Sequence, residues 1–491
     1  MRATDTAPTL GTLFPEAAGP AAGIPVAGLT ADSRRVGPGF VFVAVPGTKA
    51  DGRLFAGQAA AAGAVAMAAE GPRPAALPEA VAYLPVEDAR RALALAAARL
   101  HPHQPGTVVA VTGTSGKSSV ADFVRQIAAR LGRRSASLGT LGVVTGDGAA
   151  YGSLTTPDPV TLHETLARLA ADGITDLAME ASSHGIEQRR LDGVRLAAAG
   201  FTNLGHDHLD YHHTPEAYLA AKARLFETLL PEGATAVVNA DGPQADRVQA
   251  AVRARGLPLM TTGRAGETLR LVQAETRGFA QHLTVAAEGG DHRVALPLVG
   301  AFQVENALVA AALVLATEAG RGRTAEVLAA LSGLTGVPGR LERVGTVDGA
   351  LCVVDYAHKP EALAGVLAAL RPFARGRLVC VMGCGGDRDR AKRPMMGRIA
   401  AEGADRVIVT DDNPRSEDPA AIRAEILAAA PGAEEIGDRA EAIRAAVRDL
   451  REGDVLVVAG KGHETGQIVG DRTWPFSDRD AVRAAIEETR A

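Results

Sequence analysis

The chain has 491 residues, of which 47% are hydrophobic and 22% charged. That length exceeds what one hydrophobic core usually supports, so two or three domains are expected. Its 52 basic and 57 acidic side chains give a formal net charge of -5, which argues against general binding to nucleic acid or to an anionic membrane surface. No apolar run approaches the roughly 20 residues that span a bilayer, and we expect neither membrane insertion nor an export signal.

The three cysteines, Cys352, Cys380 and Cys384, all lie in the C-terminal third of the chain. An odd number of cysteines fits a reducing compartment, so we predict a cytoplasmic protein in which all three are small buried hydrophobes. The Cys380-x-x-x-Cys384 spacing could indicate a metal site, but no second Cys or His pair accompanies it.

The first region, 1–103, combines a strand-like run at 40–45 with an alanine-rich helical pattern at 89–100. It ends at a cluster that helices rarely enter, His101-Pro102-His103-Gln104-Pro105-Gly106. We therefore predict a small N-terminal α/β domain over 1–103.

The second region, 104–336, alternates apolar runs at 108–112, 177–179, 197–202 and 236–239 with helical patterns. Short apolar runs separated by helices predict a mainly parallel sheet covered by helices. A more polar, β-like stretch follows at 269–298, and then an apolar helix at 304–317. The next break is the glycine-rich segment 333–339.

A phosphate-binding loop is the most informative feature of this central region. It directly follows the first apolar run and reads Gly113-Thr114-Ser115-Gly116-Lys117-Ser118-Ser119. Glycines let backbone N–H groups approach phosphate oxygens, the following helix presents its positive N-terminus, Lys117 supplies a charge, and Ser118 offers a hydroxyl to magnesium. The general pattern has glycine five positions before Gly116, where this chain has Val111. An ordinary strand-to-helix turn would explain the glycines but not the Gly-Lys-Ser-Ser sequence.

The third region, 337–491, repeats strand and helix with apolar runs at 351–355, 378–382, 406–410 and 455–459. Each run is followed at once by polar, charged or glycine-containing residues. Ligands bind at the carboxyl ends of strands in open α/β sheets, so these four loops should meet in one crevice. We predict a Rossmann-like domain; since G-x-G-x-x-G does not follow its first strand, we expect no nicotinamide or flavin.

Several polar residues follow the central strands. Glu180 ends one apolar run, and a carboxylate at that sheet edge would suit Mg²⁺, which prefers oxygen ligands. The next strand is followed by polar residues and then by a lysine in a helical pattern: Asn203, His206, Asp207, His208, Asp210 and Lys222. The histidines alone could belong to a solvated loop, but their place after a strand of the same sheet favours the site.

These motifs together resemble the Mur ligases, the ATP-dependent amide-forming enzymes of peptidoglycan precursor assembly. The similarity spans nearly the whole chain, in the family's order, and rests on Thr-Gly-Thr-x-Gly-Lys, Glu180-Ala181-Ser182-Ser183-His184, Asn203 with Asp207-His208-Leu209-Asp210, Ala221-Lys222, Gly339-Arg340-Leu341-Glu342 and Asp355-Tyr356-Ala357-His358. Within the family, Asp412-Asn413-Pro414-Arg415 and Gly460-Lys461-Gly462-His463-Glu464 resemble the members that add meso-diaminopimelate as the third peptide residue.

The resemblance implies a three-domain α/β fold: 1–103 for the UDP-sugar, 104–336 for ATP, and 337–491, Rossmann-like, for the amino acid. It also implies a reaction. ATP would phosphorylate the terminal glutamate carboxylate of a UDP-N-acetylmuramoyl dipeptide, and the amine of meso-diaminopimelate would attack the acyl phosphate through a tetrahedral intermediate. Most of the catalysis would be positioning and charge neutralisation. The substrates are small molecules, and we expect a monomer.

The resemblance assigns site residues by motif. Catalysis is assigned to Lys117, Glu180, His208 and Lys222. ATP contacts are assigned to 113–119, Asn306, Arg340, Asp355 and His358. Two magnesium ions are expected on Ser118, Glu180, His208 and carbamylated Lys222. The UDP-sugar peptide is assigned to Ser33, Thr155, Thr156, Ser182, Gln188 and Arg190, with the stretches 30–34 and 47–52 as its uridine and diphosphate region. Diaminopimelate is assigned to Arg388, Asp412, Asn413, Pro414, Arg415, Gly460 and Glu464. This chain departs from the family at Gln303, where asparagine is usual, and at Lys359.

Two of these assignments carry the chemistry. An ammonium at Lys222 would repel magnesium, and the family's answer is a carbamate formed with CO₂; the alternative is a surface helical lysine. Arg415 suits bidentate contact with a carboxylate. Diaminopimelate carries one carboxylate more than lysine, so an arginine there would favour diaminopimelate. The alternative for Asp-Asn-Pro is a capped turn before the helix at Pro419.

Other functions share parts of this pattern. A sister ligase could add lysine or a dipeptide, and Arg415 discriminates against it. A folylpolyglutamate-type ligase would share the nucleotide core but would not need the N-terminal domain. A P-loop ATPase or nucleotide-dependent switch would hydrolyse ATP without an amino acid.

Overall fold

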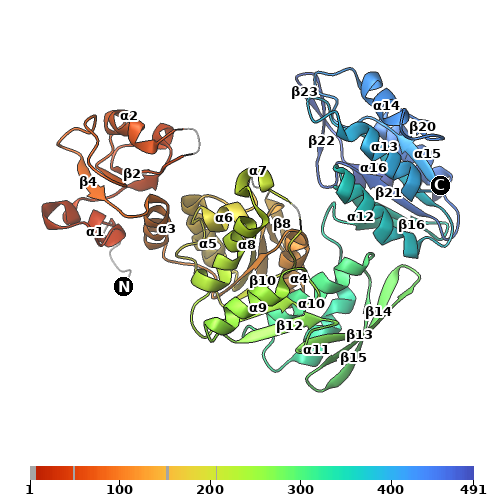
Figure 1. Cartoon of the computed structure of the whole chain (residues 1–491), viewed down its shortest axis with the longest axis horizontal. Coiled ribbons are helices and arrows are strands. Elements are labelled where there is room, and N and C mark those ends of the chain that lie inside the picture. Colours follow the sequence, from red (N-terminus) through yellow and green to blue (C-terminus); the bar gives the residue numbers. More distant parts are fainter. Residues whose placement is uncertain (1–6, 48–49, 151–153, 206, 491) are drawn as a thin grey trace. The chain divides into compact units, whose positions relative to one another are not determined.

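Three α/β sheets follow one another along the chain in the computed structural model, which describes residues 7–47, 50–150, 154–205 and 207–490 (Figure 1). The chain forms two compact units, Met1–Thr268 with Val309–Arg323 and Leu269–Leu308 with Thr324–Ala491. The N-terminal and central sheets both belong to the first unit. The domain boundaries at 103/104 and 336/337 therefore stay predictions.

The N-terminal sheet has four parallel strands in chain order, β1 (Gly28–Thr30), β2 (Phe40–Ala44), β3 (Ala66–Ala69) and β4 (Ala82–Pro85). Successive side chains of a strand point to opposite faces. Val41 and Val43 of β2 pack in one cluster with α1 (Leu10–Leu13) and α3 (Ala89–Leu100), whereas Phe42 and Ala44 pack in another with α2 (Ala56–Ala61). The predicted strand at 40–45 and helix at 89–100 are confirmed.

The central sheet places its first strand between two others. The strand order in the first unit is β12-β11-β10-β5-β9-β6-β7-β8. β5 (Thr107–Thr112) runs parallel to both of its neighbours, β9 (Asp176–Glu180) and β10 (Ala198–Phe201). The remaining strands are β6 (Ser135–Gly139), β7 (Gly142–Thr145), β8 (Gly148–Ala150), β11 (Thr235–Asn239) and β12 (Leu259–Gly263). β7 and β8 pair antiparallel at one end of this order, and the predicted mainly parallel sheet is confirmed.

Helices cover this sheet because its strands are apolar on both faces. Val108 and Ala110 of β5 share a core cluster with Leu162 and Leu166 of α5 (Pro159–Ala171). That helix begins where it does because the Asp158 carboxylate caps the N–H groups of Val160 and Thr161. The other helices of this part of the chain are α4 (Lys117–Arg130), α6 (Ser183–Glu187), α7 (Leu209–His212), α8 (Pro215–Arg224) and α9 (Ala245–Ala254).

The C-terminal sheet has the order β16-β17-β21-β18-β19-β20. Its strands are β16 (Glu342–Val347), β17 (Ala350–Asp355), β18 (Leu378–Met382), β19 (Arg406–Val409), β20 (Glu434–Glu435) and β21 (Val455–Ala459). Alternate residues of β17 face different clusters. Leu351 and Val353 pack with α12 (Pro360–Leu370), α13 (Lys392–Gly403) and α14 (Pro419–Leu427), whereas Cys352 and Val354 pack with α15 (Arg439–Arg448) and α16 (Asp478–Arg490). The four predicted apolar runs are all strands.

The second unit also holds an antiparallel meander, β13 (Leu269–Arg277), β14 (Ala280–Ala287) and β15 (Gly290–Leu296), where the sequence predicts polar β structure. α10 (Ala301–Leu315) and α11 (Thr324–Ala330) follow it. A two-stranded hairpin, β22 (Gly466–Val469) with β23 (Arg472–Pro475), precedes α16. Within the described part of the chain, every helix is too short or too polar to cross a bilayer.

Candidate functional site

The phosphate loop lies at the carboxyl end of β5 and leads into α4 at Lys117. Gly113 and Gly116 have φ values of +149° and +87°, which glycine adopts without a side-chain clash. A Cβ atom on Gly113 would lie 1.9 Å from Thr202 Oγ1 at the end of β10. The loop therefore needs glycine here to pass close to the neighbouring strand.

Contacts within the loop fix its shape. Lys117 Nζ donates to the carbonyl oxygens of Gly113 and Thr114, at 2.9 Å each. The Ser115 N–H donates to Asn203 Oδ1 at 3.1 Å, and Thr202 Oγ1 donates to the Ser115 carbonyl at 2.7 Å. Asn203 thus holds the loop from the end of β10, which gives that residue a structural role beside any ligand contact.

Glu180 and Ser118 meet as the sequence predicts. Ser118 Oγ donates to Glu180 Oε1 at 2.8 Å, and the buried carboxylate also accepts from the Thr140 N–H at 2.8 Å and from Thr140 Oγ1 at 3.3 Å. A hydroxyl beside a carboxylate matches the oxygen donors that Mg²⁺ takes with phosphate and water. The sequence analysis did not identify Thr140. The one feature that could have indicated a role is its position directly after the end of β6. No group of three or more His, Cys, Asp or Glu in the described residues could hold a metal by itself.

Lys222 is buried, with 1% of its surface exposed, so the alternative of a surface helical lysine is wrong. Its Nζ donates to the Gly113 carbonyl at 2.7 Å and lies 4.4 Å from the centre of the Tyr218 ring. Burial, aided by the nearby positive charge of Lys117, lowers the pKa of Lys222 to about 6. The amine is therefore mostly neutral at pH 7.

His208 lies in an aromatic cluster beside the phosphate loop. Its ring is 4.9 Å from that of His184 and 6.3 Å from that of Tyr218, and the Tyr218 hydroxyl is 3.2 Å from Thr114 Oγ1. His208 has a φ of +54° and its Nε2 is 3.6 Å from the Asp207 carboxylate. Its metal role stays a prediction. His206 lies outside the described residues, as do the side chains of Leu209 and Asp210.

Most residues predicted to hold the UDP-sugar peptide form one hydrogen-bonded group. Thr156 Oγ1 is 3.0 Å from Ser182 Oγ, and Arg190 donates to the Thr156 carbonyl at 2.6 Å and to Gln188 Oε1 at 2.7 Å. Thr155 Oγ1 is 3.0 Å from Thr140 Oγ1, which links this group to Glu180.

Ser33 belongs to a different part of the chain. It starts a short 3-10 turn after β1, and its hydroxyl donates to Gln58 at 3.1 Å. Asp32 caps this turn by accepting from the Arg34 N–H, and Asp51 caps a similar turn by accepting from the Arg53 N–H. Thr48 and Lys49, in the second predicted uridine stretch, lie outside the described residues.

In the second unit, Asp355 organises the loop after β17. Its carboxylate accepts from the N–H groups of Leu341 and Ala357 at 2.7 and 2.8 Å, and burial raises its pKa. The Arg340 guanidinium lies 5.2 Å from the centre of the Tyr356 ring, and the His358 ring lies 4.6 Å from it. Asn306, on α10, is buried and donates to Gln303 Oε1 at 3.0 Å. Gln303, the residue that departs from the family's usual asparagine, therefore orients Asn306.

The residues predicted to bind diaminopimelate lie in loops after β18, β19 and β21, which are adjacent strands. A Cβ atom on Gly385 would lie 2.8 Å from Arg415 Nη1 and 3.7 Å from Arg388 Cγ, so both arginines border this glycine. Arg415 Nη1 donates to the Gly386 carbonyl at 2.9 Å. Asp418, not the Asp-Asn-Pro segment, caps α14. The Glu417 N–H donates to the Pro414 carbonyl at 3.1 Å, so a turn precedes that helix, and the binding role of Asp412–Pro414 stays a prediction.

Lys461 is a buried residue at the centre of these loops that sequence reasoning did not assign. Its Nζ donates to Asn413 Oδ1 at 2.8 Å and to the Gly466 carbonyl at 2.7 Å, and lies 3.4 Å from the Asp412 carboxylate. Since Asn413 Oδ1 is an acceptor here, its Nδ2 faces Glu464 Oε2 at 2.9 Å. Gly460, with a φ of +124°, is required because a Cβ would lie 2.5 Å from Asp412 Oδ2.

The β22–β23 hairpin borders the same loop. The Arg415 N–H donates to the Ile468 carbonyl at 3.1 Å, and the Gly470 N–H donates to the Arg415 carbonyl at 2.7 Å. Arg415 has a φ of +54°, which an arginine rarely adopts. The hairpin thus holds the backbone of Arg415 in this unusual conformation.

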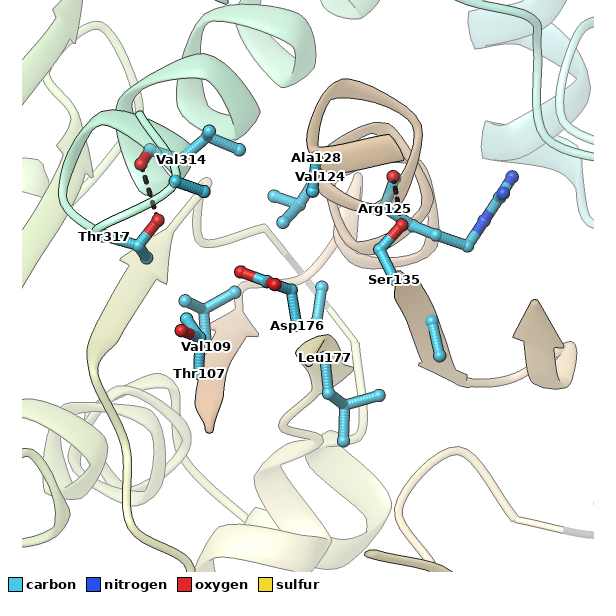
Figure 2. Close-up of a pocket in the computed structure, with 13 residues that line it drawn as sticks. Thr107, Val109, Val124, Arg125, Ala128, Ser135, Asp176, Leu177, Val314 and Thr317 are labelled. Atoms are coloured by element: carbon cyan, nitrogen blue, oxygen red, sulfur yellow. Dashed lines mark hydrogen bonds between the residues drawn. The ribbon is translucent and has the colours of Figure 1, made fainter. Parts of the chain in front are cut away.

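A pocket in the first unit lies at the other end of the central strands. Figure 2 shows it lined by Thr107 at the start of β5, Asp176 at the start of β9, and Thr317. The phosphate loop follows the opposite, carboxyl end of β5. This pocket therefore lies apart from the residues that the motifs predict.

All three cysteines are buried and free, as predicted. Cys384 Sγ contacts Met396 Sδ at 3.7 Å, and burial raises the pKa of each thiol to about 12. The thiols therefore act as apolar packing groups.

The fold and the phosphate loop, with its paired hydroxyl and carboxylate, define a P-loop nucleotide-binding protein of the α/β class. Three protein-family models match the chain. "Mur ligase family, catalytic domain" matches residues 25–101, "Mur ligase middle domain" matches 111–314, and "Mur ligase, glutamate ligase domain" matches 339–462. The chain belongs to the Mur ligase family.

Curated relatives are similar over nearly the full length. A protein of Mesorhizobium japonicum is 57% identical over 96% of both chains, and one of Bradyrhizobium diazoefficiens is 56% identical over 95% of this chain and 96% of its own. Both are named UDP-N-acetylmuramoyl-L-alanyl-D-glutamate--2,6-diaminopimelate ligase.

Solved structures agree with this fold. A structure of a ligase with that name is 33% identical, with a TM-score of 0.77 over 99% of this chain and all of the other. MurF ligase from Thermotoga maritima in complex with ADP is 20% identical, with a TM-score of 0.58 over 94% of this chain and 98% of the other, and supports the fold alone.

Replacing Gly113 by Ala tests the close approach of the phosphate loop. The added Cβ would collide with Thr202 Oγ1, so the loop must move, and we expect ADP to bind on the order of 100-fold more weakly. Isothermal titration calorimetry with MgADP measures this change. Gly146→Ala is the control, since a Cβ there meets open space; equal ADP affinity in both variants would contradict the role of Gly113.

Proposed function

We propose that this chain is the ATP-dependent ligase that joins meso-2,6-diaminopimelate to UDP-N-acetylmuramoyl-L-alanyl-D-glutamate. The proposal rests on the position of Arg415. Arg415 and Arg388 both border Gly385, in loops at the carboxyl ends of adjacent strands. The names of the relatives that are 54–57% identical support the same substrates. We further propose that it works as a monomer in the cytoplasm.

The phosphate loop would bind the β- and γ-phosphates of ATP. Its backbone N–H groups and the N-terminus of α4 offer donors, and Lys117 would exchange its contacts with the loop carbonyls for phosphate oxygens. Ser118 and Glu180 would hold one magnesium ion, and Glu180, His208 and carbamylated Lys222 a second. When bound, magnesium neutralises charge on the phosphates. Asn306, Arg340, Asp355 and His358 are proposed as further ATP contacts.

The reaction requires activation because a carboxylate has no good leaving group. The glutamate carboxylate attacks the γ-phosphorus of ATP, the bond to the β-phosphate oxygen breaks, and ADP leaves. The neutral amine then attacks the acyl phosphate carbonyl, the tetrahedral intermediate loses phosphate, and the nitrogen loses a proton. Ser33, Thr155, Thr156, Ser182, Gln188 and Arg190 would orient the UDP-sugar peptide for the first step.

The amino-acid site would select its substrate by charge. Arg388 and Arg415 offer guanidinium groups to a carboxylate, while Asp412, Asn413 and Glu464 offer oxygen acceptors to an ammonium group. Pro414 and Gly460 would shape the loops around it. Lysine lacks the second carboxylate, and its binding would leave a partly buried arginine unpaired.

The complete reaction is the direct test. We expect ADP release only when ATP, the UDP-sugar dipeptide and meso-diaminopimelate are all present, together with a UDP-sugar tripeptide product detected by mass spectrometry. ATP hydrolysis that is independent of both other substrates would instead favour a P-loop ATPase or switch.

Replacing Arg415 by Ala tests amino-acid selection. Loss of a charge-assisted contact of about 1.5–3 kcal/mol should raise the KM for meso-diaminopimelate roughly 10- to 100-fold, while the KM for ATP changes little. The preference over lysine should fall by a similar factor. Arg448→Ala, on an exposed position of α15, is the control; an unchanged preference in Arg415→Ala would refute the assignment.

Replacing Lys222 by Ala tests the carbamate. Neutral at pH 7 with a pKa of about 6, Lys222 can react with CO₂, since only the unprotonated amine does so. We expect kcat to fall on the order of 100-fold and added formate or acetate to restore part of it by replacing the lost carboxylate. Normal turnover in Lys222→Ala, unaffected by these acids, would rule out the role.

A further inference from the structure

Two loops carry the arginines of the proposed amino-acid site. The 383–388 loop follows β18 and contains Arg388, and the 411–417 loop follows β19 and contains Arg415. The strands are parallel neighbours, so both loops leave the same edge of the sheet. How far apart the two guanidinium groups lie depends on how the loops are joined.

A close set of hydrogen bonds joins the loops. Ser416 donates from its hydroxyl and its N–H to the Asp387 carboxylate, at 2.7 and 3.1 Å. In the opposite direction, the Asp387 N–H donates to Glu417 Oε1 at 2.6 Å. The Gly386 N–H donates to the Asn413 carbonyl at 3.1 Å, and a Cβ on Gly386 would lie 1.9 Å from the Pro414 carbonyl oxygen. The backbones are therefore in direct contact.

The joined loops contain three residues whose backbone lies in the left-handed region. Asp387, Asn413 and Arg415 all have positive φ, at +53°, +47° and +54°. Asp and Asn adopt this conformation more readily than most side chains, whereas an arginine rarely does, so Arg415 needs surrounding contacts to hold it. The β22–β23 hairpin holds Asn413 and Arg415, and contacts between the two loops hold Asp387.

A buried arginine, Arg393, holds the Glu417 side chain in place. The Glu417 Oε1 atom, which accepts from Asp387, also accepts from Arg393 Nη2 at 2.8 Å. The Arg393 side chain is fully buried on α13, and its Nη1 donates to Glu425 Oε2 at 3.0 Å. One buried guanidinium thus fixes the oxygen that holds the 383–388 loop.

We propose that Glu417 is a positioning residue, which fixes the 383–388 loop against the 411–417 loop and so sets the spacing of Arg388 and Arg415 for the distal carboxylate of the amino-acid substrate. This inference rests on the proposed function. Glu417 itself makes no substrate contact; it acts through the backbone of Asp387.

The test compares Glu417→Ala with Glu417→Gln. Both known contacts use Oε1, which glutamine retains and alanine lacks. We expect Glu417→Ala to raise the KM for meso-diaminopimelate roughly 10-fold or more, with kcat at saturation within about 3-fold and the KM for ATP unchanged. Glu417→Gln should stay near the wild-type KM. Discrimination against lysine should fall with Glu417→Ala alone.

Glu425→Ala is the matched control. Glu425→Ala also removes a carboxylate that accepts from buried Arg393, and with it a contact to Arg390, but the Asp387 N–H does not donate to Glu425. We expect a lower melting temperature with an unchanged KM for meso-diaminopimelate. Equal KM increases in Glu425→Ala and Glu417→Ala, or an unchanged KM in Glu417→Ala, would overturn the proposal.

Hydrogen exchange of the free protein separates the two proposals. Faster exchange at the Asp387 amide in Glu417→Ala than in Glu417→Gln is expected whether or not the wild type ligates diaminopimelate. An inactive wild type with this difference would refute the proposed function but leave the loop contact standing. An active wild type whose exchange does not differ between the variants would refute the positioning role.

Discussion

Both groups of site residues depend on parallel strands whose carboxyl ends share one edge of a sheet. In the central sheet, β5 lies between β9 and β10, so the phosphate loop, Glu180 and Asn203 leave the sheet side by side. In the C-terminal sheet, β21, β18 and β19 are neighbours, and the loops that follow them carry Glu464, Arg388 and Arg415 at one edge of the sheet. The strands are apolar on both faces, and helices cover them, so polar groups gather at this edge.

Close backbone approach is the second requirement of this arrangement. Gly113 passes Thr202, and Gly386 passes Pro414, at distances where a Cβ atom would collide. Each contact brings together two loops that are distant in sequence. The glycines thus do more than permit unusual dihedral angles, because they let loops from neighbouring strands act as one surface.

The sequence predicted the strands at 378–382 and 455–459 and the helix at 89–100 to the residue, because apolar runs and their flanking polar residues mark such elements clearly. It also predicted that Ser118 and Glu180 belong to one site, since both follow strands of one sheet. It could not predict Thr140, Lys461 or Glu417. Their roles arise from contacts between separate loops. Neither residue type nor local spacing distinguishes Thr140 and Glu417 from ordinary surface residues, and the motif that contains Lys461 does not show which groups its ammonium contacts.

The environment of Lys222 follows from the same geometry. Lys117 and Lys222 both donate to the carbonyl oxygen of Gly113, at 2.9 and 2.7 Å. Burial disfavours an ammonium at Lys222, and two ammonium groups at one carbonyl also repel each other, so the pair is more stable with Lys222 neutral. A carbamate at Lys222 would replace this repulsion with attraction between an anion and the Lys117 cation. Burial disfavours either charge at Lys222, so the proposed carbamate depends on this attraction to Lys117.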